Sequence, residues 1–212
     1  MKKTIIALLA LGSMAMATQT EDLTVTSTTI GLDTEALTLT LTGIDGASTG
    51  TIDTDAFTGA EGFSPKIQFV QGANDGCYWD LSLTITNKTE NTITLTGMTL
   101  DMFSTTGSGG NHAAGIQDTE VTLTLGDVQF GSGVAVLGAN SASDTATITG
   151  TYELAAGATE EISLRVQRTK AGAYTGFASI SGGTLSYAVV PEPATATLSL
   201  LALAGLAARR RR

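Results

Sequence analysis

Residues 79–86 read WDLSLTIT, a strict alternation of apolar and polar residues that recurs through most of the chain. Successive side chains of a β-strand point to opposite faces, so the odd-numbered residues from Trp79 to Ile85 share one face. The same period of two is found at residues 37–42 and 121–125. These stretches are predicted to be strands with one face buried in a core.

Further strands are predicted from shorter patterns, and residues 18–189 show no convincing helical period. The apolar residues of Thr92–Phe103 change phase at Gly97, which predicts a bulge there, and the polar residues 87–91 predict a hairpin loop. The additional strands are Leu23–Ile30, Lys66–Val70, Thr92–Phe103, Val134–Leu137, Thr145–Leu154, Glu160–Gln167, Tyr174–Ser181 and Leu185–Val190.

Short, regularly spaced strands with glycine-rich turns predict one all-β domain, an antiparallel β-sandwich of jelly-roll type. Its length of about 170 residues is sufficient for a sizeable core. The residues predicted to point inward are Leu81, Leu83, Ile85, Val121, Leu123, Ile162 and Leu164.

The first 17 residues have the pattern of a secretory signal peptide that forms a short helix. Lys2 and Lys3 precede an apolar core at residues 5–11, and Ala15 and Ala17 form a small-x-small cleavage site. Cleavage is therefore expected before Thr18, followed by export.

The C-terminal residues form a second targeting segment. Val190-Pro191-Glu192-Pro193 is followed by an apolar run of about 15 residues and by Arg209, Arg210, Arg211 and Arg212. A helix of that length reaches about 22 Å, so it spans a bilayer only marginally as a short transmembrane helix. The arginines favour the cytoplasmic side and act as a stop-transfer signal.

The order Pro191-Glu192-Pro193, short apolar helix and terminal arginine cluster resembles the PEP-CTERM sorting signal of Gram-negative bacteria. The resemblance covers the last 23 or so residues and the layout of a secreted body with a tail. It implies that an exosortase, an integral-membrane cysteine protease-like enzyme, is the partner that reads the tripeptide and processes the tail. The alternative is a plain tail anchor with an incidental proline pair.

The expected organisation is a signal peptide at 1–17, a secreted β-sandwich at 18–189 and a sorting segment at 190–212. The two targeting segments hold most of the 11 basic residues and one of the 20 acidic residues. The body keeps five basic and 19 acidic residues, a net charge of −14. Such a surface repels phosphate backbones, so nucleic acid is not an expected partner.

Few residues suit catalysis or metal binding. Asp45, Asp53, Asp55 and Asp75 lie in stretches expected to be oxygen-rich loops, which makes them candidate calcium ligands, although none has EF-hand spacing. Asp53 and Asp55 are also a candidate carboxylate pair for glycoside hydrolysis, but in a segment expected to be an exposed loop. No other cofactor is expected.

Four further features of the sequence could take part in catalysis, binding or modification, and most of them also have a purely structural interpretation. His112, the sole histidine, lies in a glycine-rich run unsuited to a catalytic triad. Cys77 is either a buried residue or a free thiol. Trp79 shares the apolar phase of its strand, which favours the core over a sugar-stacking role. Asn87-Lys88-Thr89 is a glycosylation sequon.

The sequence therefore predicts an exported protein, anchored in the membrane by its C-terminus before it is sorted to the cell surface or extracellular matrix. It is expected not to be an enzyme. The resemblance implies a role near extracellular polysaccharide, a possible partner. The alternatives are a surface-displayed carbohydrate-binding module and a secreted hydrolase.

Overall fold

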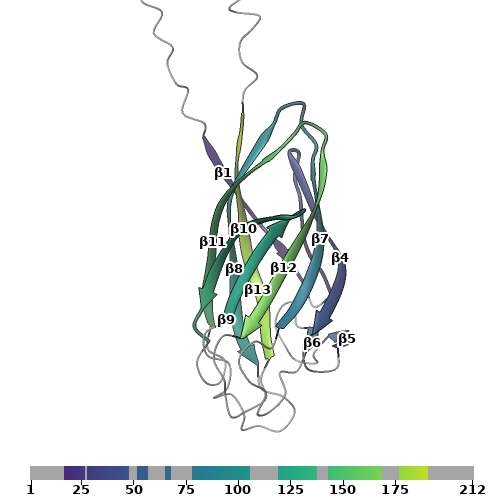
Figure 1. The fold of residues 1–212 in the computed structure, drawn as a ribbon, viewed down its shortest axis with the longest axis vertical. Helices are drawn as coiled ribbons and strands as arrows, with labels where there is room; N and C mark the ends of the chain where they lie inside the picture. The colour runs from purple at the N-terminus through teal and green to yellow at the C-terminus, as the bar shows by residue number, and fades with distance from the viewer. Residues whose placement is uncertain are drawn as a thin grey trace, which may run out of the picture.

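The computed structural model describes residues 17–26, 28–47, 52–56, 65–67, 78–105, 119–137, 143–168 and 177–190. These residues form two antiparallel sheets packed as a sandwich, together with a two-stranded sheet (Figure 1). The predicted antiparallel β-sandwich is thus confirmed, while its jelly-roll type stays a prediction. Both predicted targeting helices lie outside the described residues. Within the described ranges, no helix is long and apolar enough to cross a membrane.

One face of the sandwich is a four-stranded sheet in which every pairing is antiparallel. The chain's first and last described strands are neighbours in it. In spatial order its strands are β1 (Thr18–Asp22), β13 (Phe177–Val189), β8 (Ile93–Thr105) and β11 (Ser143–Leu154).

The other face is a seven-stranded sheet built around β7, which contains the sequence WDLSLTIT. In spatial order its strands are β10 (Val128–Ala135), β9 (Thr119–Leu125), β12 (Thr159–Arg168), β7 (Tyr78–Asn87), β4 (Leu37–Ala47), β3 (Ile30–Asp33) and β2 (Thr24–Val25). The separate pair is β5 (Ile52–Ala56) with β6 (Pro65–Ile67).

The core lies between the two large sheets and follows the period of two. All seven residues predicted to point inward are at most 1% exposed. Burying a side chain of this size contributes about 1.5–3 kcal/mol. The alternation therefore determined correctly which face of β7, β9 and β12 is buried.

The predicted bulge in β8 is present at the expected place. Ser186 pairs with Gly97 and Tyr187 pairs with Leu95, so Thr96 is the extra residue. The bulge lets the apolar residues on both sides of it, from Ile93 to Met102, remain in the core.

At one edge of the sandwich, the N-terminal segment passes from one sheet to the other. β1 pairs with β13, whereas β2 pairs with β3. Between β1 and β2, the backbone N–H of Leu23 donates to the carbonyl oxygen of Gly183 at 2.8 Å, and the Leu23 side chain is buried. This crossing ties the two sheets together.

At the opposite edge, β10 packs closely against β11 without a hydrogen-bonded ladder. A Cβ at Gly133 would lie 2.7 Å from the carbonyl carbon of Thr147, and a Cβ at Gly150 would lie 2.9 Å from the Phe130 ring. Only glycine permits so close an approach of two backbones.

Several predicted elements are wrong. The structure has one strand, β13, where two were predicted, because Gly182 and Gly183 continue the pairing with Asp101 and Leu100 after a register shift between Ile180 and Gly182. The predicted strand Leu23–Ile30 is divided between β2 and β3. Residues 87–91 do join two strands, but β7 and β8 belong to different sheets, so the connection is not a hairpin.

Two segments expected to be loops are strands. β4 extends to Ala47 and includes Asp45, whose backbone pairs with Asp80. Asp53 and Asp55 lie in β5, with Asp53 paired to Lys66. Strand pairing with a partner distant in sequence outweighs the weak local preference of glycine and aspartate for turns.

Candidate functional site

The last strand ends where the predicted sorting motif begins. Val190 directly precedes Pro191, and its backbone N–H donates to the carbonyl oxygen of Thr92 at 2.8 Å. On the other side of β13, Thr18 pairs with Ala188. The start of β1 and the end of β13 therefore lie side by side at one end of the sandwich (Figure 1).

A pocket of about 590 Å³, here called the exit pocket, lies beside this point. Strands β1 and β13, the turn between β3 and β4, and the loop after β7 all contribute to it. Its lining residues are Gln19, Glu21, Thr34, Glu35, Ala36, Thr89, Tyr187 and Val189.

Tyr187 is the most buried residue of the exit pocket, with a side chain 1% exposed. Burial raises the pKa of the Tyr187 phenol and the charge of Glu21 raises it further, while a hydrogen bond with Thr34 acts in the opposite direction. The phenol is consequently neutral at neutral pH. The formal charge of the pocket comes from Glu21 and Glu35.

The turn that holds Glu35 is fixed by a threonine side chain. Thr34 Oγ1 accepts hydrogen bonds from the backbone N–H groups of Ala36 at 3.3 Å and Leu37 at 3.0 Å. The backbone N–H of Thr34 donates to the carbonyl oxygen of Leu37 at 2.9 Å. This local bonding is typical of threonine in turns and keeps Glu35 at an ordered, exposed position.

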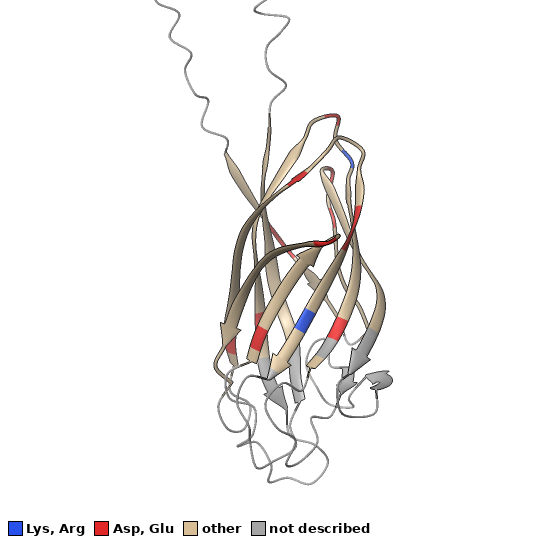
Figure 2. Cartoon of the chain, in the orientation of Figure 1, with Lys and Arg blue, Asp and Glu red and all other residues tan. Residues whose placement is uncertain are grey.

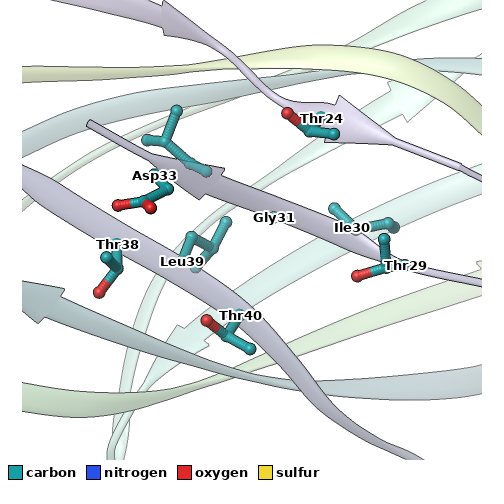
Figure 3. A pocket seen from close by; sticks show the side chains of 9 residues that line it. Thr24, Thr29, Ile30, Gly31, Asp33, Thr38, Leu39 and Thr40 are labelled. Atoms are coloured by element: carbon teal, nitrogen blue, oxygen red, sulfur yellow. The ribbon is translucent and has the colours of Figure 1, made fainter.

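A second concavity of about 340 Å³ lies over β3 and is called here the Gly31 groove. Figure 3 shows threonine hydroxyls around it, from Thr24, Thr29, Thr38 and Thr40. A Cβ at Gly31 would come within 2.8 Å of the Leu39 carbonyl oxygen, so packing requires glycine there. Asp33 Oδ1 accepts from Lys88 Nζ at 3.0 Å, and no lining residue is aromatic.

A charged cluster lies on the outer face of the seven-stranded sheet. Arg165 Nε and Nη2 donate to the two carboxylate oxygens of Asp80, both at 2.8 Å. The guanidinium also stacks on the Tyr78 ring, 3.9 Å from its centroid. The hydrogen bond with Asp80 raises the pKa of Arg165. Sequence reasoning missed this cluster because its members are brought together only by the register of β7 and β12.

Lysine and arginine residues are rare in the described strands, whereas aspartate and glutamate residues are spread over both sheets (Figure 2). The described surface therefore agrees with the strongly negative charge of the body. It offers no extended basic face for a nucleic acid.

The glycosylation sequon is part of the internal structure. Asn87 is fully buried, and its Nδ2 donates to the carbonyl oxygens of Asn91, Leu154 and Ala155 at 2.8–3.0 Å. Its Oδ1 accepts from the backbone N–H and the hydroxyl of Thr89. An amide engaged in this way is inaccessible to a transferase in the folded domain.

The candidate metal ligands lie outside the part of the chain whose side chains the structure describes. The side chains of Asp45, Asp53 and Asp55 and the whole of Asp75 lie outside the described residues, as do His112 and Cys77. Among the described residues, no group of three or more His, Cys, Asp or Glu is placed to hold a metal ion. The calcium site stays a prediction.

Sugar rings stack on exposed aromatic side chains, and the aromatic residues of the chain have different positions. Tyr187 is in the core and Tyr152 is half-buried against it. Burial, followed by the charge of Glu160, raises the pKa of Tyr152. The backbone of Trp79 lies in β7, while its side chain and Tyr174 lie outside the described residues.

Comparison with solved structures finds distant similarity to carbohydrate-binding proteins. A family 35 carbohydrate-binding module from an environmental isolate is 18% identical, with a TM-score of 0.36, and the match covers 71% of this chain and 88% of that one. A CBM35 from Cellvibrio japonicus Abf62 is 15% identical, with a TM-score of 0.35, covering 79% and 92%. A family two carbohydrate esterase from Clostridium thermocellum is 12% identical, with a TM-score of 0.32, covering 71% and 34%.

No curated protein matches the chain. A family model described as the PEP-CTERM protein-sorting motif matches residues 189–212. This match confirms the resemblance seen in the C-terminal sequence, and it implies export and processing by an exosortase-type system at the cell envelope. The chain thus carries a PEP-CTERM protein-sorting motif, which begins at Val189 in the wall of the exit pocket.

Proposed function

We propose that this protein is exported through an N-terminal signal peptide, sorted by an exosortase through its C-terminal tail, and retained as a non-enzymatic component of the cell surface or extracellular matrix. The observation that carries the proposal is the sorting motif at residues 189–212. The position of β1 supports the export step. It begins at Thr18, so cleavage after Ala17 leaves this strand complete.

The third functional class, a secreted hydrolase, depends on the surroundings of its carboxylic acids. A glycoside hydrolase uses a carboxylic acid whose pKa is raised by burial. The buried polar residues among the described ones are Asn87, Thr94 and Thr119, and none of them is a carboxylic acid.

The test separates the two parts of the tail. Replacing Arg209–Arg212 by Ser should let the chain slip through the membrane and be released. Replacing Pro191, Glu192 and Pro193 by Ala should leave the chain in the inner membrane with its full mass. Cell fractionation and mass spectrometry, in a host that has an exosortase, measure both outcomes. Sorting of both variants like the parent would refute the proposal.

A carbohydrate-binding module is the second candidate, and the Gly31 groove favours it. Its threonine hydroxyls and its Asp33 carboxylate, which accepts a hydrogen bond from the neighbouring Lys88, can form hydrogen bonds with sugar hydroxyls. A glycan array probed with and without calcium tests this function. Binding that is lost in a Thr38→Val, Thr40→Val variant would support the groove as the site, and an empty array would remove the candidate.

A further inference from the structure

The sorting motif follows the folded domain without a free linker. Val189 pairs with Ile93, and the Val190 N–H is bonded to Thr92. An extended residue advances the chain by about 3.3 Å, so three residues can carry the chain at most about 10 Å beyond Val190. An enzyme that encloses the tripeptide must therefore come against this end of the sandwich.

The exit pocket is a concavity at that end. Val189, the first residue of the motif match, lines it together with Tyr187 from the same strand. Gln19 and Glu21 lie on β1, which is paired with β13 directly beside the motif. The pocket and the motif thus form one continuous surface.

We propose that the exit pocket is a docking surface for the enzyme that reads the Pro-Glu-Pro tripeptide, and that it takes a lysine or arginine side chain of that enzyme. This inference rests on the proposed function, since it requires that the tail is processed. It adds that recognition includes the folded domain as well as the tail.

The charge of the pocket selects a cationic partner. Glu21 and Glu35 are its two formal charges, and no basic residue lines it. The nearest basic side chain of the adjoining loop, Lys88, is paired with Asp33 at 3.0 Å. Two accessible carboxylates favour approach of a cation and repel an anionic lipid surface, so the membrane is not the expected occupant.

The test measures the rate of tail processing by pulse-chase of the full chain in a host with an exosortase. The double variant Glu21→Gln, Glu35→Gln is compared with the matched control Glu153→Gln, Glu161→Gln, which removes two exposed charges on β11 and β12. Processing should slow about three- to tenfold in the first and stay at the parental rate in the control. Protease resistance of the sandwich in the same extracts shows whether each variant is folded. The single variant Glu35→Gln repeats the test while it keeps the Glu21 charge that raises the pKa of Tyr187.

A linker variant sharpens the result. Inserting about six Gly and Ser residues between Val190 and Pro191 moves the motif up to about 20 Å from the pocket, so the glutamine substitutions should then have no effect.

Equal rates for parent and exit-pocket variant in the unmodified chain, or faster processing of that variant, would overturn the docking surface. If Pro-Glu-Pro replacement by Ala also left processing unchanged, the proposed function itself would fail.

Discussion

The Asn87 side-chain nitrogen lies 3.0 Å from the carbonyl oxygen of Leu154, although 67 residues separate the two. The same amide reaches Ala155, and the Asn87 backbone N–H donates to the carbonyl oxygen of Ala158 at 2.9 Å. Asn87 therefore ties the end of β7, in one sheet, to the turn that leads from β11 in the other sheet to β12. The crossing between the sheets is held by a buried polar side chain.

Replacing Asn87 by Ala should destabilise the domain by about 2–4 kcal/mol, because it leaves the buried carbonyl oxygen of Leu154 and two part-buried carbonyl oxygens without their donor. Urea unfolding measures the change in the free energy of unfolding. Glu90→Ala is the matched control, since Glu90 is exposed in the same loop. A loss no larger than that of the control would show that solvent replaces these hydrogen bonds.

Asn87 should carry no glycan when the protein is produced in a host with N-glycosylation machinery. Its Nδ2 is fully buried and donates to three carbonyl oxygens, so the folded domain withholds the acceptor nitrogen. Peptide mass spectrometry reads the occupancy of the site. High occupancy in the folded protein would contradict the buried position.

The sequence predicted the features that depend on local periodicity. The alternation in β7, β9 and β12 identified the buried face, and the phase change at Gly97 identified the bulge in β8. The tail was recognisable because its three parts are contiguous in the sequence. In each of these cases the information lies within one continuous stretch of the sequence, the longest being the tail at residues 189–212.

Features that depend on distant contacts were not predictable. Asn87 in a polar loop predicted a hairpin, yet its hydrogen bonds with Leu154 and Ala155 serve a crossing between sheets. The exit pocket combines β1 with β13, whose paired residues Thr18 and Ala188 are near opposite ends of the body. No local pattern of residues encodes such a pairing.

Replacing Gly133 by Ala should destabilise the domain by about 3 kcal/mol, because the new Cβ would come within 2.7 Å of the Thr147 carbonyl carbon. Gly157→Ala is the contrasting variant. Gly157 has φ of +67° with nothing within 4 Å of a Cβ, so only the left-handed backbone costs energy there, about 1 kcal/mol. Thermal unfolding ranks the two variants, and the reverse order would mean that β10 does not pack so closely on β11.

Replacing Leu83 by Asp should unfold the domain, since it would bury an unpaired charge in a domain whose total stability is about 5–15 kcal/mol. Thr84→Asp, one residue further along β7 on the outer face, should be tolerated. Circular dichroism and melting temperature distinguish the two variants. Equal melting temperatures would show that the inward assignment of β7 is wrong.

The stability of the domain should fall above about pH 10, and Tyr187 should account for part of the loss. Its pKa is raised in the folded state, mainly by burial and further by Glu21. The folded protein therefore holds this proton more tightly than the unfolded chain. The resulting stability is complete below the unfolded pKa and is lost as the pH rises through the folded pKa. Tyr187→Phe should flatten the decline of the unfolding free energy above about pH 10, measured by urea unfolding, and Glu21→Gln should make the decline smaller. Some decline should remain, because the pKa of Tyr152 is also raised. Parallel curves for parent and Tyr187→Phe would show that the phenol at the exit pocket titrates as it does in water.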